Sequence, residues 1–92
     1  MELKYKALFK KMMDDLKDGQ MLMDWAKELS KDCPEVSKYL LEVAETRVTG
    51  DFNKTMTFVD TMFDKEMTKE FDFLLDELDD WKEELVSKMK RM

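Results

Sequence analysis

The sequence contains no histidine, one cysteine, one proline and two glycines. Without histidine the chain lacks the most common general base at neutral pH and the most common metal ligand of proteins. A single cysteine cannot form a disulfide within the chain, which excludes the disulfide framework of small secreted proteins and favours a cytoplasmic protein. Two glycines are too few for a glycine-rich phosphate loop. We therefore expect no enzyme activity, no cofactor and no metal site.

Long apolar runs are also absent. The segment at the N-terminus has no stretch of seven apolar residues, and the chain nowhere has 18 in a row, so we expect neither a signal peptide nor a membrane span. The formal net charge is −6, from 16 basic and 22 acidic residues. Proteins that bind nucleic acid carry a basic surface to meet phosphate. The charge therefore predicts no direct contact with nucleic acid and no binding to anionic membranes.

The residues that are present favour helices. Charged residues make up 41% of the chain and hydrophobic residues 43%, with many strong helix formers. We predict an all-α fold, a small antiparallel helical bundle of four to five helices that forms a single domain over residues 1–92. A chain of this size buries only about 60–65% of the surface that it exposes when unfolded, so a second copy that covers apolar surface would stabilise it. We predict a dimer.

Three breaks between helices are predicted from turn residues. Gly50 follows "AETRVT" and precedes "DFNK", the pattern of a helix that ends with glycine just beyond its last turn. In "DCPE", Asp32 is placed to cap a helix, Pro34 suits the first helical turn and Glu35 completes a capping box. Gly19 indicates a third break, although the apolar residues keep a helical phase across it.

A fourth break is predicted near residues 64–68. No glycine or proline follows Gly50, so residues 52–90 have the composition of one long helix. The apolar stripe, however, shifts its phase between Phe63 and Phe71, which favours a break over the alternative of one helix that changes partners. The expected helices cover residues 2–18, 20–31, 34–49, 52–64 and 68–90.

Two carboxylate patterns in the sequence resemble metal sites only in part. Glu42 and Glu45 lie three residues apart on one helical face, which suits a hard cation but also an ordinary solvated surface. The segment 51–62, "DFNKTMTFVDTM", begins like a calcium loop but has Met56 where glycine is required and Met62 where a bidentate glutamate is required. A carboxylate metal-binding bundle is therefore kept only as an alternative function.

The segment 70–84 is strongly acidic. Eight carboxylates oppose one lysine, a net charge of −7, which amounts to about half the axial charge density of duplex DNA. An acidic inhibitor that mimics nucleic acid toward a basic enzyme is a second alternative function. Acidic helical faces of acidic proteins are mostly solvated, so we predict that Asp76 and Asp80 act mainly through the salt dependence of binding.

Phe73 is predicted to lie among these carboxylates, away from the apolar stripe of its helix. An aromatic side chain with a polar rim resembles the anchor of a protein interface; the alternative is that Phe73 packs against another helix. Near the first predicted break, "QMLMDWAKEL" is apolar over more than a core-facing stripe needs. The candidate partner-binding residues are Phe73, Asp76, Asp80, Met21, Met23 and Trp25.

These observations predict a non-catalytic protein–protein interaction module. Its partner is another protein or a second copy of the chain in a homodimer. Ten methionines are consistent with a surface that adapts to a partner, although core filling is the more common role of this residue.

Overall fold

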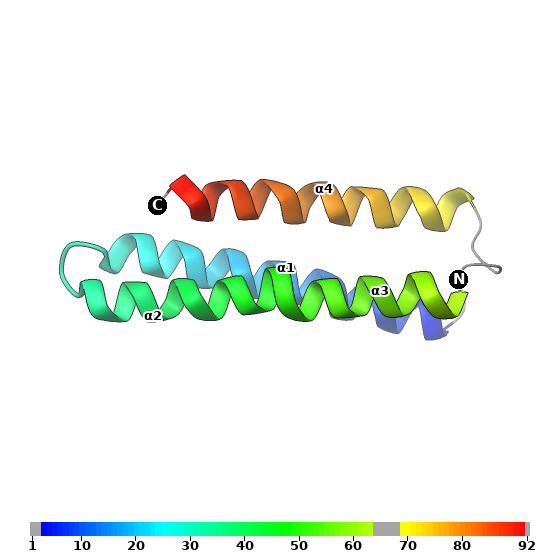
Figure 1. Cartoon of the computed structure of the whole chain (residues 1–92), viewed down its shortest axis with the longest axis horizontal. Coiled ribbons are helices and arrows are strands. Elements are labelled where there is room, and N and C mark those ends of the chain that lie inside the picture. The colour runs from blue at the N-terminus through cyan, green and yellow to red at the C-terminus, as the bar shows by residue number, and fades with distance from the viewer. Residues whose placement is uncertain (1–2, 64–68, 92) are drawn as a thin grey trace.

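The computed structural model describes residues 3–63 and 69–91. Its elements are α1 (Leu3–Leu29), α2 (Pro34–Glu45), the π-helical segment η1 (Thr46–Asp51), α3 (Phe52–Phe63) and α4 (Lys69–Arg91). Because α2, η1 and α3 follow one another without a gap, the described residues form three helical rods rather than four or five (Figure 1). The all-α prediction is confirmed, and the predicted number of helices is too high.

The rods form an elongated bundle of 49 × 19 × 18 Å. α1 and α4 run in the same direction, and the rod made of α2, η1 and α3 runs in the opposite direction (Figure 1). Rods that follow one another along the chain are therefore antiparallel. The parallel arrangement of α1 and α4 places their first turns at the same end of the molecule.

The predicted break near residue 33 is confirmed. α1 ends at Leu29, and α2 begins with Pro34 in its first turn, where its missing N–H has no helical partner. The N-cap position is occupied by Cys33 rather than by Asp32, and no side chain caps this end. The hydroxyl of Ser37 donates a buried hydrogen bond of 2.6 Å to the carbonyl of Ala26. This bond attaches the start of α2 to the end of α1.

The predicted break at Gly19 is wrong, because α1 continues through this residue without interruption. Gly19 is buried and faces Val48 of η1, and a Cβ atom at Gly19 would overlap the Cγ2 atom of Val48. Gly19 therefore allows α1 and η1 to pack closely against each other, and it does not end a helix.

The predicted break at Gly50 is also wrong, because this residue lies within η1 and no described glycine has a positive φ. The fully buried residues Ala44, Val48 and Phe52 recur every four residues along the rod, followed by the half-buried Met56. Each four-residue step overshoots a full α-helical turn by about 40°. A wider π-helical turn takes up this drift, so the rod keeps its apolar face on the core without a break.

The core joins all three rods. Phe71 of α4 packs edge-on against Phe9 and Tyr5 of α1, with ring centroids 4.7 and 4.8 Å apart. The buried apolar cluster consists of Phe9, Met12, Leu16, Met23, Val48, Phe52, Val59, Phe71, Leu75, Leu78 and Leu85.

The predicted break at 64–68 lies outside the described residues.

The two glycines are expected to respond oppositely to alanine. Gly19→Ala should lower the free energy of unfolding by about 1–3 kcal/mol, because the stiff side chain of Val48 must move. Gly50→Ala is the matched control: its new Cβ meets only the Cγ2 atom of Thr46, at 3.8 Å, and alanine favours a helix by up to about 1 kcal/mol. Denaturant unfolding of both variants measures the difference, and equal effects at the two positions would contradict this role of Gly19.

Candidate functional site

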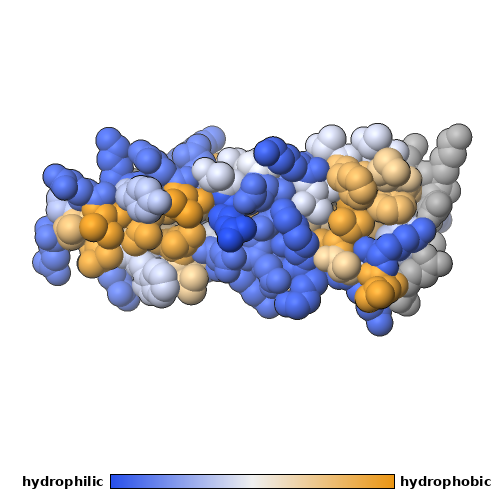
Figure 2. Space-filling model, turned by 90° about the horizontal axis from the view of Figure 1, so that it is seen from below, coloured by the Kyte–Doolittle hydropathy of each residue, from blue (hydrophilic) through white to orange (hydrophobic). Residues whose placement is uncertain are grey.

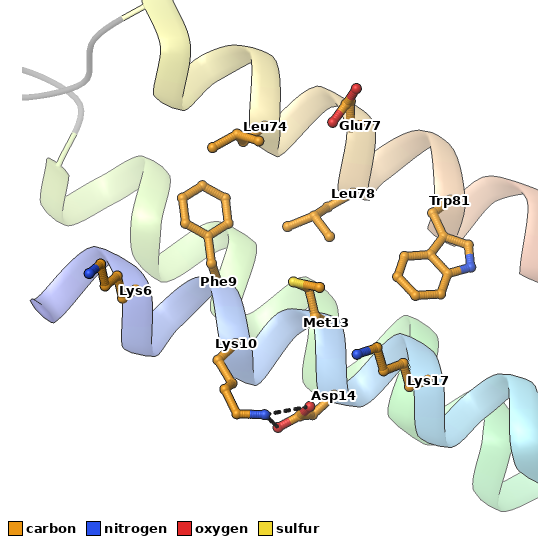
Figure 3. Close-up of a pocket in the computed structure, with 10 residues that line it drawn as sticks. All are labelled: Lys6, Phe9, Lys10, Met13, Asp14, Lys17, Leu74, Glu77, Leu78 and Trp81. Carbon is orange, nitrogen blue, oxygen red and sulfur yellow. Dashed lines mark hydrogen bonds and ion pairs between the residues drawn. The ribbon is translucent and has the colours of Figure 1, made fainter. Parts of the chain in front are cut away.

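A groove of about 500 Å³ runs between α1 and α4 (Figure 3). We call it the α1–α4 groove. In Figure 3 the side chains of Phe9, Leu74 and Leu78 point into the space between the two helices, and Trp81 lies at one end. The groove is lined by Lys6, Phe9, Lys10, Met13, Asp14 and Lys17 from α1 and by Leu74, Glu77, Leu78 and Trp81 from α4.

The helical spacing of α1 explains this lining. Residues three or four apart share one flank of a helix, so Lys6, Lys10, Met13 and Lys17 follow one another along the groove. The neighbouring core stripe of Met12 and Leu16 faces the bundle interior and is fully buried. Met13 is exposed at the groove because it lies beside this stripe rather than within it.

A second hollow of about 350 Å³ extends the groove toward the end of α1. It shares Lys17 and Trp81 with the α1–α4 groove and adds the exposed side chains of Met21 and Trp25. Together the two hollows present a continuous apolar surface over several turns of both helices.

The two edges of the α1–α4 groove carry opposite charge. The α1 edge contributes Lys6, Lys10 and Lys17, and the ammonium of Lys10 lies 3.3 Å from the carboxylate of Asp14. The α4 edge contributes Glu77. Asp80 and Glu84, three and seven residues further on, are exposed on the same flank of α4. The groove is therefore basic along one side and acidic along the other.

Another flank of α4 holds a half-buried lysine. The Lys82 ammonium lies 2.9 Å from the carboxylate of Glu83 and 3.3 Å from that of Asp79. The hydrogen bond to Glu83 raises the pKa of Lys82 above its usual value, and Asp79 acts in the same direction against the opposing effect of burial. Asp79 and Glu83 are thus both ion-paired with Lys82 on their own helix.

The structure separates the predicted partner-binding residues. Phe73 is 61% exposed, and Asp76 and Asp80 are exposed on the same helix. Met21 and Trp25 lie at the second hollow, as described above. Met23 does not belong to this surface: it is only 5% exposed and packs in the core cluster, because two residues along a helix turn it about 200° away from Met21.

Met13 and Trp81 line the groove although neither was predicted as a contact residue. Trp81 follows Leu78 by three residues, the spacing of the buried stripe of α4, yet it is half-buried and lines both hollows. The position of Met13, one residue after the core residue Met12, was the available signal. A methionine outside the stripe has no core role to fill.

Other surfaces of the molecule are less continuous. On the face turned away from α4, Figure 2 shows two hydrophobic areas separated by a hydrophilic belt. Between α3 and α4 a hollow of about 530 Å³ is lined by Met56, Leu75 and four aspartates, Asp60, Asp72, Asp76 and Asp79.

Among residues 3–63 and 69–91, no helix is long and apolar enough to cross a membrane.

Comparison of the chain with protein-family models, with curated protein sequences and with solved structures gave no match.

Proposed function

We propose that the chain is a non-catalytic protein–protein interaction module of the cytoplasm and that it binds its partner through the α1–α4 groove. The observation that carries the proposal is the exposure of Met13 in the α1–α4 groove and of Met21 and Trp25 in the adjoining second hollow, both with charged edges. Exposed apolar surface with a polar rim marks interaction sites on soluble proteins.

The shape of the groove favours a helical partner. Two parallel helices with apolar side chains between them form a trough that accepts the apolar face of a third, amphipathic helix. Methionine suits such a trough because its flexible, polarizable side chain adapts to the shape of the partner. Phe73 lies one helical turn before Glu77 on the same flank of α4, where it can contact a helix seated in the groove.

Phe73→Ala tests this surface. The substitution should weaken association with protein partners by at least about 1 kcal/mol, because exposed aromatic anchors contribute strongly to interfaces. It should change folding stability little, since Phe73 is 61% exposed. Tyr39→Ala is the matched control, because Tyr39 is 64% exposed but lies on α2, which contributes no residue to either hollow, whereas Phe73 lies on α4 beside the groove.

The measurement is a pull-down from a lysate of source cells with immobilised wild type, Phe73→Ala and Tyr39→Ala, alongside thermal unfolding of each variant. We expect proteins that wild type and Tyr39→Ala retain and that Phe73→Ala loses. Retention of the same proteins by all three would contradict the assignment of binding to this groove. A large loss of folding stability in Phe73→Ala would place this residue in the core instead.

A further inference from the structure

We propose that the α1–α4 groove also binds a fatty acid, with its alkyl chain along the groove and its carboxylate against the ammonium of Lys17. The inference goes beyond the proposed function, because this ligand is a small molecule that the chain binds without a protein partner. It is carried by an apolar groove of ligand size whose inward-facing charge is an unpaired cation.

The groove has the size of a small-molecule site. Its volume of about 500 Å³ lies within the range of about 300–1,000 Å³ that is common for ligand pockets. Phe9 and Leu78 are buried members of the core cluster, so they form the floor between the two helices. Met13 and Leu74 line the same space from α1 and α4. A helix about 10 Å wide rests on the rim of such a groove, whereas an alkyl chain is narrow enough to lie along its floor.

Most charges around the groove are already paired or are turned away from it. Lys10 is ion-paired with Asp14 at 3.3 Å, and in Figure 3 this pair extends from the side of α1 that faces away from α4. The Glu77 carboxylate points away from α1 in the same view. Lys6 lies at the end of the groove beyond Phe9, with its ammonium turned outward. None of these four groups directs its charge at the floor.

Lys17 differs from these residues. In Figure 3 its ammonium is directed toward the space between Met13 and Trp81. Within the described part of the chain, this ammonium has no ion pair. A lysine stem packs along apolar surface while its charge stays in contact with water, so the charge lies at the mouth of the groove. An anionic group that binds here gains an ion pair without first breaking one.

A cation beside an apolar groove favours a negatively charged amphiphile. The alkyl chain is stabilised by leaving water, in proportion to the apolar surface that it covers. The carboxylate is stabilised by a charge-assisted hydrogen bond from Lys17. The alkyl chain extends from Lys17 toward Phe9, where the lining is apolar. The second hollow, on the other side of Lys17, is lined in part by Asp24 and Glu28, which would repel the carboxylate.

Calorimetric titration of the whole chain with sodium decanoate tests the site. We expect saturable binding of one decanoate per chain, with a dissociation constant below about 1 mM. Decan-1-ol, which has the same alkyl chain without a charge, should bind at least about threefold more weakly. Decyltrimethylammonium should bind at least about tenfold more weakly, because it meets Lys17 with like charge. Equal or tighter binding of this cationic probe would show that the acidic edge of α4 dominates and would overturn the proposal.

Charge reversal at Lys17 separates the headgroup from the groove. Lys17→Glu should weaken decanoate binding at least about tenfold and change decan-1-ol binding by less than about twofold, because only the charged headgroup meets this position. Lys38→Glu is the matched control: it makes the same charge change at an exposed lysine of α2 that lines neither hollow, and it should stay within about twofold of wild type. Equal losses of decanoate and decan-1-ol in Lys17→Glu would contradict the role of Lys17. A larger effect of Lys6→Glu than of Lys17→Glu would place the headgroup at the other end of the groove and contradict it as well.

NMR of the methionine methyl groups locates the ligand. Met13 lines the groove, so its methyl signal should shift with decanoate along the same saturation curve as the heat of binding. Met62 is the internal control, because it is 59% exposed on α3 and does not line the groove. Comparable shifts of both signals would mean that decanoate partitions onto any apolar surface, and the groove would then not be its site.

This result does not depend on a protein partner. If wild type binds no decanoate up to about 5 mM, the fatty-acid site does not exist. The proposed function still stands in that case if lysate proteins are retained by wild type and lost by Phe73→Ala. If decanoate binds as expected and no protein is retained, the fatty-acid site stands and the interaction module is contradicted.

Discussion

Phe52→Ala is expected to lower the free energy of unfolding by about 3–5 kcal/mol. Phe52 is 0% exposed and belongs to the largest fully buried side chains, at the junction of η1 and α3. Its removal loses the burial of an aromatic ring and leaves a cavity where the rods meet. Small domains have a total stability of about 5–15 kcal/mol, so the variant should lose a large share of it.

The matched control is Phe58→Ala on the same helix. Phe58 is 48% exposed, and its ring contacts Phe63 edge-on at 6.1 Å, so its loss should cost no more than about 1 kcal/mol. Denaturant unfolding followed by circular dichroism compares the two variants. Equal costs at the two positions would mean that Phe52 does not hold the rods together as the structure shows.

The elements that the sequence predicted well depend on local patterns. The all-α class followed from composition, and the turn near residue 33 followed from a proline in the first turn of a helix. Phe71, Leu78 and Leu85 of α4 recur at seven-residue intervals, a helical spacing that the sequence shows, and all three are buried. Each of these features is encoded within a few turns of the chain.

The two glycine breaks failed because glycine has more than one structural use. A glycine ends a helix when the chain adopts a positive φ, and it also permits two helices to approach closely. The residue that decides the case at Gly19 is Val48, 29 positions away. At Gly50 the deciding feature is the four-residue spacing of the buried positions along the whole rod. The residues next to Gly50, "TGDF", do not show this spacing.

The groove was only partly predictable for a similar reason. Met21 and Trp25 were predicted as contact residues because their segment is apolar over more than a core-facing stripe needs. Phe73 was predicted because it lies among carboxylates. The groove itself lies between helices more than 60 residues apart, and its lining depends on how α1 and α4 are aligned. Met23 was misplaced because the side of α1 that faces the core is set by the position of the other rods.

The second large effect concerns a buried charge at the middle of the bundle. The carboxylate of Asp15 is only 4% exposed and lies 2.5 Å from the Lys11 ammonium and 3.6 Å from the Arg47 guanidinium. Arg47 also reaches Asp18 at 3.7 Å and Asp51 at 3.6 Å. These ion pairs join α1 to η1, beside the π-helical turn.

Lys11→Met combined with Arg47→Met should lower the free energy of unfolding by at least about 2 kcal/mol, because a buried carboxylate then loses both cationic partners. Methionine keeps much of the aliphatic length of each side chain, so little packing is lost. The effect should stay below that of a pair buried on both sides, about 3–5 kcal/mol, because both cations are nearly half exposed.

Adding Asp15→Leu to this double variant should recover part of the lost stability, because an apolar side chain of similar size needs no partner in a buried position. Asp15→Leu in the otherwise wild-type chain should cost less than the double substitution, since Lys11 and Arg47 can turn to solvent or to Asp51. Denaturant unfolding of the four proteins closes this cycle. If the triple variant is no more stable than the double variant, the loss comes from the cation side chains themselves and not from the stranded charge of Asp15. In that case the ion pairs contribute little to the contact between α1 and η1, and the contact depends instead on the close approach that Gly19 permits to Val48.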